Sequence, residues 1–274
     1  MSLQLSPHQD KTAHPASRVS FRAIRIVFLL FVLIVIGLGQ WMVKQRIMDW
    51  NRSLWVVLYP INGDGSPQST AYIQSLNEDI FNPVESFMET EGLRYRLGLQ
   101  DPIRIELAPQ VNTLPPTLHQ NASLLKIVWW SLKMRFWAQR SDTYQGPTPD
   151  IRIFAIFFDP LTHKSLNHSF GLEKGRLAIA NVYATPLQAE QNNFVIAHEL
   201  LHTIGASDKY HLETTQPRHP DGYAEPDKAP LYPQNRAEIM GGRIPHSPFE
   251  SELPNDLSDA RIGEQTAKEI RWRE

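Results

Sequence analysis

Hydrophobic positions after residue 50 fall into short apolar runs that alternate with longer stretches of helical spacing. The apolar runs predict buried strands at 54–59, 151–158 and 177–183, and a polar–apolar alternation predicts a half-buried strand at 103–107. Helical spacing predicts helices at 70–95, 124–138, 187–204 and 257–272. We expect Pro60 to end the first strand. The order of elements predicts an α+β (α/β-like) domain in which helices pack on a sheet.

The N-terminal part of the chain has a different pattern. No charged residue occurs from Ile26 to Val43, and the centre of this run consists of large apolar side chains. Such a run lies at the short end of the lengths that cross a bilayer, and Trp41 stands where an indole prefers the interface. We therefore predict a cytoplasmic tail at 1–22, one transmembrane helix acting as a signal anchor at 23–43, a connector at 44–52 and one domain at 53–274.

Charges beside the predicted span indicate its orientation. One acid, Asp10, opposes the cations that precede the span, which are Lys11, Arg18, Arg22 and Arg25. The positive-inside rule then places the N-terminus in the cytoplasm and the domain on the periplasmic or extracytoplasmic side of a cell inner membrane. Two alternatives are a cleaved signal peptide, with a weak small-residue site at 37–39, and a helix buried in a soluble core.

Composition and charge limit the kinds of partner and metal ligand that the chain can use. The chain has 274 residues, 42% hydrophobic and 20% charged, as in ordinary globular proteins. Its net charge of -2 disfavours nucleic acid as a partner. The basic N-terminal segment conceals a more acidic remainder, so we expect the exported domain to be soluble and not to lie on anionic lipid. Cysteine is absent, so any metal must be held by His, Asp or Glu.

One short stretch carries candidate chemistry. His198 and His202 are four residues apart, so on a helix they share a face and can present two imidazoles to one metal ion. Glu199 then lies beside the metal, where it suits a general base acting on metal-activated water. Gly205 can end the helix and turn the chain, which lets Asp208 return as a third ligand. Two imidazoles and a carboxylate leave one tetrahedral position open, as in catalytic zinc sites.

The third ligand has rivals. Asp208 could hold the turn while another side chain binds the metal, and His211 is the nearest alternative, followed by Glu225. The spacing of Asp208 after Gly205 favours Asp208 over both. The histidines could also be ordinary surface or core residues, which the presence of Glu199 and Asp208 in register argues against.

The extended motif from His198 to Asp208 resembles the metzincin clan of zinc peptidases, in the variant where aspartate replaces the usual third histidine. Snapalysin-type bacterial proteases share this variant, including a tyrosine two residues after the aspartate, which Tyr210 matches. The segment 238–242 resembles the clan's methionine turn, with Met240 as its methionine. The resemblance covers about 45 residues.

The resemblance implies a metzincin-like zincin fold. This fold has a twisted, mostly parallel sheet with an antiparallel edge strand, an active-site helix and a C-terminal helix. It also implies that 177–183 is the edge strand that pairs with an extended peptide. The chain departs from the clan at Gly242, where several members have a tyrosine that contacts the metal or the transition state. Tyr210 and Tyr223 are the candidates to replace it.

Together these features predict a membrane-anchored zinc endopeptidase (a metalloprotease) that acts on peptides or proteins. His198, His202 and Asp208 would bind Zn2+, and Glu199 would be the catalytic base. The alternatives are a membrane-tethered binding module with a closed structural zinc site, with His211 as a fourth ligand, and an inactive peptidase-like scaffold. An intact Glu199 argues against the scaffold.

Overall fold

The computed structural model describes residues 25–34, 49–118 and 123–273, and the chain divides into two units at 1–44 and 45–274. In the first unit residues 25–34 are helical, and their side chains are mostly exposed. The rest of the predicted span at 23–43 lies outside the described residues. Within the described part of the chain, no helix has the length and apolar character that crossing a bilayer requires.

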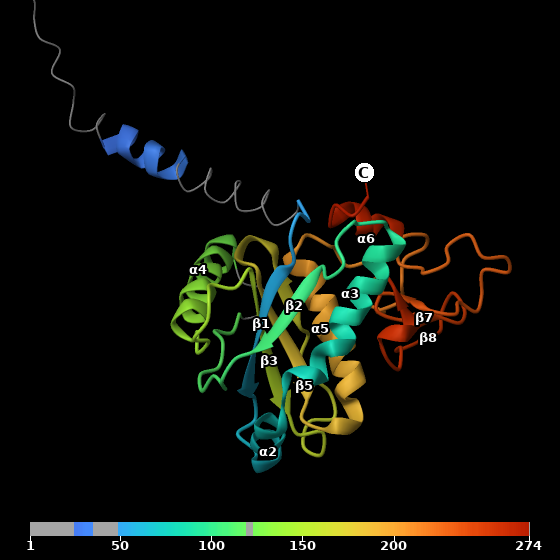
Figure 1. Cartoon of the computed structure of the whole chain (residues 1–274), viewed down its shortest axis with the longest axis horizontal. Helices are drawn as coiled ribbons and strands as arrows, with labels where there is room; N and C mark the ends of the chain where they lie inside the picture. The colour runs from blue at the N-terminus through green and yellow to red at the C-terminus, as the bar shows by residue number, and fades with distance from the viewer. Residues whose placement is uncertain (1–24, 35–48, 119–122, 274) are drawn as a thin grey trace, which may run out of the picture. The chain divides into compact units, whose positions relative to one another are not determined.

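A five-stranded sheet forms the centre of the second unit, in the order β2-β1-β3-β5-β4 (Figure 1). The strands are β1 (Leu54–Asn62), β2 (Ile103–Leu107), β3 (Ile151–Phe158), β4 (Phe170–Leu172) and β5 (Leu177–Tyr183). β2, β1, β3 and β5 run parallel to their neighbours, and β4 pairs antiparallel with β5. The predicted mixed fold, with a mostly parallel sheet and an antiparallel edge strand, is therefore confirmed.

Helices cover both faces of this sheet, which explains its apolar strands. α3 (Asn82–Arg94) and α5 (Ala189–Thr203) lie on one face, and α4 (Leu124–Arg140) lies on the other (Figure 1). One hydrophobic cluster joins the first face to α3 and α5, and a second joins the opposite face to Met134 and Ala138 of α4. Strands buried on both faces read as continuous apolar runs, as β1, β3 and β5 do.

Three of the predicted elements need correction. The helix predicted at 70–95 is divided into α2 (Pro67–Ser75), the 3-10 turn η1 (Glu78–Phe81) and α3, because Leu76 and Asn77 are extended and Pro83 suits a first helical turn. β1 continues through Pro60, which stands opposite Ala155 in β3. The helix predicted at 257–272 is the short α6 (Glu264–Glu269), preceded by η4 (Leu257–Asp259) and β9 (Ala260–Arg261).

The edge strand was also placed wrongly. β5, predicted at 177–183 to lie at the edge, has β3 on one side and β4 on the other. Gly171 in β4 stands opposite Ala178 in β5, so β4 is the strand that lies at this edge. A three-residue strand shows no periodic signal, which is why the sequence did not reveal it.

Two short strand pairs and one buried carboxylate join parts of the C-terminal region. β6 (Ala237–Glu238) pairs with β9, and β7 (Ile244–Pro245) pairs with β8 (Ser251–Glu252). Glu238 is fully buried and accepts hydrogen bonds from the backbone N–H of Gly241 at 2.7 Å, from that of Gly263 at 3.0 Å and from the Thr266 hydroxyl at 2.6 Å. These bonds fix the 238–242 turn against the start of α6.

Candidate metal centre

The last turns of α5 present two histidines on one face. His198 and His202 are one helical turn apart, with ring centroids 4.8 Å apart and planes at 84°. The helix ends at Thr203, and Gly205 follows with φ 108°, a left-handed conformation that favours glycine. This turn reverses the chain toward the two rings, as the spacing predicted.

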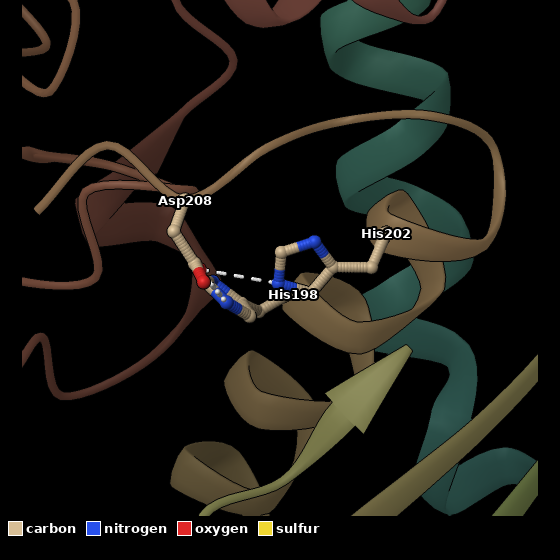
Figure 2. Close-up of side chains that lie close together, drawn as sticks. All are labelled: His198, His202 and Asp208. Carbon is tan, nitrogen blue, oxygen red and sulfur yellow. Dashed lines mark ion pairs between the residues drawn. The ribbon is translucent and has the colours of Figure 1, made fainter. Parts of the chain in front are cut away.

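Asp208 returns from that turn to face both rings, as Figure 2 shows. Its Oδ1 lies 3.2 Å from His198 Nε2 and 3.1 Å from His202 Nε2. Donor atoms of all three residues lie within 4.8 Å of one another, and they form a group that could hold a metal ion. Ligands at zinc-like bond lengths on one tetrahedral ion stand about 3.3 Å apart, so the observed spacing fits a single ion.

Backbone carbonyls fix the orientation of both imidazoles. His198 Nδ1 lies 2.9 Å from the Ile239 carbonyl oxygen, and His202 Nδ1 lies 2.8 Å from that of Ala206. In each neutral ring the Nδ1–H donates to the carbonyl, so the Nε2 lone pair points at Asp208. Metal-binding histidines are held in this way, with the second ring nitrogen donating to a fixed acceptor.

An unsatisfied oxygen marks the point where these groups converge. Asp208 Oδ1 is buried, and it has no hydrogen-bond donor although two ring nitrogens face it. Two lone pairs and an anionic oxygen at this distance repel one another unless a cation or a proton lies between them. Burial would raise the pKa of Asp208, but with such a proton on the rings of His198 and His202 the pKa of Asp208 lies well below its usual range. The donor set fits a divalent transition metal.

Glu199 is a second unsatisfied carboxylate beside this group. Its side chain is buried on α5, and Oε2 has no hydrogen-bond partner within the described residues. Burial raises the pKa of Glu199 to about 7, while the nearby imidazoles of His198 and His202 act to lower it. A buried carboxylate with a free oxygen is costly unless a ligand or a reaction uses it, so its position beside the metal-binding group is a functional signal.

The rival ligands lie elsewhere. His211 is exposed, and Glu225 Oε2 accepts a hydrogen bond from Asn235 Nδ2 at 2.8 Å. Neither belongs to the metal-binding group found among the described residues. Asp208 is therefore the third residue that the fold brings to the two histidines.

The two candidate tyrosines differ in whether they lie beside the two histidines. The Tyr210 ring lies 6.4 Å from the His198 ring, measured between centroids. Burial, together with the Asp208 charge, raises the pKa of Tyr210 to about 12, so its hydroxyl stays protonated and can donate. The Tyr223 hydroxyl instead lies 2.6 Å from that of Tyr232. Tyr210 is thus the tyrosine available beside the centre.

The segment predicted as a methionine turn touches the centre through its backbone. Ile239 provides the carbonyl that accepts from His198, and the Met240 carbonyl accepts from the backbone N–H of Lys209 at 2.9 Å. The Met240 side chain is fully buried in the core. The segment therefore orients one histidine and fixes the residue after Asp208, which is a positioning role.

The edge strand β4 passes directly against α5, the helix that carries His198 and His202. A Cβ added to Gly171 would lie 2.4 Å from His202 Cβ and 2.8 Å from the Glu199 carbonyl oxygen. Only glycine fits at such a distance without movement of the strand or the helix. The open edge of the sheet therefore lies beside the turn of α5 that carries Glu199 and His202.

Some contacts of the centre left no signal in the sequence. Every residue type has a backbone carbonyl, so nothing in the sequence marks those of Ile239 and Ala206 as acceptors. Lys209 and Glu269 are sixty positions apart, so their pairing has no local pattern. Only the glycine at 171, between two apolar residues, could have indicated a close backbone approach. No protein-family model matches this chain, and no characterised protein matches it.

Proposed function

We propose that this protein is a zinc-dependent endopeptidase, with His198, His202 and Asp208 as the metal ligands. The observation that carries the proposal is the buried Oδ1 of Asp208, which faces two Nε2 atoms and has no donor of its own. Two imidazoles and one carboxylate leave a coordination position for water or substrate, and no fourth protein ligand joins the group within the described residues. An open position favours catalysis over a closed structural site.

A zinc ion held there would supply a Lewis acid that lowers the pKa of water and polarises a carbonyl. Glu199 accepts a proton from the attacking water, whose oxygen bonds to the carbonyl carbon of the peptide. The carbon–nitrogen bond then breaks, and Glu199 returns the proton to the leaving amine. In this proposal the Tyr210 hydroxyl, which stays protonated, donates to the carbonyl oxygen as it becomes anionic.

The fold agrees with the resemblance of the motif to metzincin peptidases. The structure has a mostly parallel sheet with an antiparallel edge strand, and Gly171 of that strand lies against the α5 turn that bears Glu199. An extended peptide paired with the open edge of β4 would run past this turn, which suits a peptidase. β4 takes the role that the sequence assigned to 177–183.

The test measures hydrolysis and metal content together. The full chain in detergent is incubated with a diverse peptide pool, with and without a zinc chelator, and products are read by mass spectrometry. We expect cleavage that the chelator abolishes and added zinc restores. Absence of cleavage from zinc-loaded protein would contradict the proposal and favour a binding module.

Three variants separate the roles of the residues. Glu199→Gln is expected to keep zinc and lose about a hundredfold or more in activity, because general base catalysis contributes that much. His202→Ala and Asp208→Ala are expected to lose zinc. Glu190→Gln, at an exposed position on the same helix, is the control for the loss of a carboxylate and is expected to behave as wild type.

The anchor and its location are part of the same proposal. The uncharged run from Ile26 to Val43, with cations before it, supports a single-pass inner-membrane protein whose domain lies on the extracytoplasmic side. Protease added to intact spheroplasts should digest the domain at 45–274. Digestion only after lysis would contradict this orientation.

A further inference from the structure

α4 exposes an apolar stripe that the proposed peptidase does not use. Leu125, Trp129, Leu132 and Phe136 recur at helical spacing and share one face, and they are 82%, 61%, 50% and 66% exposed. A stable helix on a folded domain normally turns its apolar face inward and its polar face to water. The outer face of α4 is therefore apolar where solvent would favour polar residues.

The opposite side of α4 is the one that packs on the sheet. Met134 and Ala138 are buried there, the Trp137 ring lies 4.6 Å from that of Phe154, and the Trp130 ring lies 5.6 Å from that of Phe170. The helix is thus fixed on the sheet by its inner face (Figure 1). The outer stripe is not a poorly packed core face, because the core face is already occupied.

Cations border the stripe on both sides. Helical geometry puts Lys126, Lys133 and Arg140 along one border and Arg135 along the other, and α4 contains no acidic residue. The Lys133 ammonium lies 5.8 Å from the centre of the Trp129 ring, so its stem follows the apolar surface. Long cationic side chains beside a Trp, Leu and Phe face are typical of helices that lie in a membrane interface.

We propose that the outer face of α4 lies on an anionic phospholipid bilayer, with Leu125, Trp129, Leu132 and Phe136 in the interface and the bordering cations against lipid phosphates. Charge complementarity selects this partner. A second copy docked on the same stripe would bring cationic borders together in either orientation, which is unfavourable. This proposal replaces the expectation, drawn from the acidic net charge, that the domain does not lie on anionic lipid. A surface potential acts only within a Debye length, so the cations beside the stripe outweigh acidic groups elsewhere on the domain.

The test uses the absence of cysteine from the chain. Leu132→Cys and Leu253→Cys, at positions 50% and 54% exposed, each receive one nitroxide in the full-length protein. Leu253 follows β8, which lies apart from α4 in Figure 1. The proteins are placed in vesicles of phosphatidylcholine containing phosphatidylglycerol. Power saturation then compares accessibility to oxygen, which enters lipid, with accessibility to a nickel complex, which stays in water.

We expect the label at 132 to be accessible to oxygen and protected from nickel, and the label at 253 to be accessible to nickel. Nickel access at 132 equal to that at 253 would overturn the proposal. Protection at 132 from both reagents would also overturn it, because it shows a protein cover, and dipolar coupling between labels would identify that cover as a second copy. The labels report environment and not hydrolysis, so the result is independent of the proposed peptidase activity.

A charge variant tests the role of the cations. Lys133→Gln with Arg135→Gln, in the Leu132→Cys background, removes one cation from each border. At about fivefold per cation near an anionic surface, the ratio of docked to undocked protein should fall about 30-fold. Arg96→Gln with Lys268→Gln, at exposed positions just after α3 and in α6, should leave that ratio unchanged. Equal docking of the two double variants would refute the role of the bordering cations.

Discussion

The ammonium of Lys209 lies 2.8 Å from the Glu269 carboxylate, inside the protein and directly after Asp208 in the chain. Lys209 is 2% exposed, and its Nζ also donates to the Ser207 carbonyl oxygen at 2.9 Å. Glu269 accepts from the Ser207 backbone N–H at 2.9 Å as well. The pair therefore ties both neighbours of Asp208 to α6, and it fixes the position of Asp208 beside the two histidines.

Removal of Glu269 should destabilise the protein and weaken metal binding. Glu269→Ala leaves a buried ammonium without its counter-ion, which costs about 3 kcal/mol or more. Urea unfolding with and without zinc measures the effect. The control is Glu264→Gln on the same helix, where an exposed pair with Arg273 contributes little, so no measurable change is expected. A stability of Glu269→Ala equal to wild type would contradict the role assigned to the pair.

Gly171→Ala should disturb the centre from the strand side. Its Cβ would meet His202 Cβ and the Glu199 carbonyl, so β4 or α5 must move. We expect about tenfold weaker zinc binding, measured by competition with a chromophoric chelator, because overpacking costs of this size are typical. Gly175→Ala, whose added Cβ has its nearest neighbour at 3.7 Å, is the matched control. Unchanged zinc affinity in both variants would show that β4 and α5 can move apart at residue 171 without disturbing the site.

Met240 should matter for stability and not for the metal. Met240→Ala removes a fully buried side chain and is expected to cost about 2–5 kcal/mol, while Met240→Leu should cost less than about 1.5 kcal/mol. The carbonyls of residues 239 and 240 persist in both variants. Zinc affinity measured on the folded fraction should therefore stay at the wild-type value. A loss of zinc in Met240→Leu would assign the thioether a direct role.

Tyr210→Phe tests the donor proposed for the anionic carbonyl oxygen. The variant should keep zinc and lose about a hundredfold in kcat, because removal of one such donor typically has an effect of this size. Tyr223→Phe, whose hydroxyl contacts Tyr232, should keep its kcat. Equal kcat values for wild type and Tyr210→Phe would leave the open metal position as the stabilising group.

Asp64 should make stability depend on pH in the acid range. Burial acts to raise the pKa of Asp64, but backbone N–H donors of Asp159 and Ser66 lower it to about 2. The depressed pKa adds stability above pH 4 that is lost as pH falls toward 2. Wild type should exceed Asp64→Asn in free energy of unfolding at pH 7, and the difference should shrink below pH 4. Chelated protein is used, and Asp101→Asn is an exposed control.

The core strands were predictable because burial on both faces makes a simple pattern. β3 and β5 have the limits that the apolar runs predicted at 151–158 and 177–183. Short elements were not predictable, since β4 and the β6–β9 pair depend on partners and not on local periodicity. The predicted bounds of the C-terminal helix were wrong for the same reason. Ala260 and Arg261 pair with a distant strand, so the helix begins only at Glu264.

The candidate centre also has a part that the sequence predicts and a part that it does not. The spacing of His198, His202, Gly205 and Asp208 is local, so helix geometry and one glycine were enough to predict that they converge. Contacts that hold them come from remote segments, such as the Ile239 carbonyl and Glu269. No local pattern encodes such contacts, because the tertiary fold brings them together.

The acceptors that orient His198 and His202 are main-chain oxygens, from Ile239 and Ala206. A point mutation can change either side chain but cannot delete the carbonyl, as long as the chain keeps its path. The hydrogen bonds that align the two rings therefore do not depend on which side chain stands at position 206 or 239. Relatives that keep this arrangement could have other side chains that fit these two buried positions, and they would be recognised by backbone course and not by residue identity.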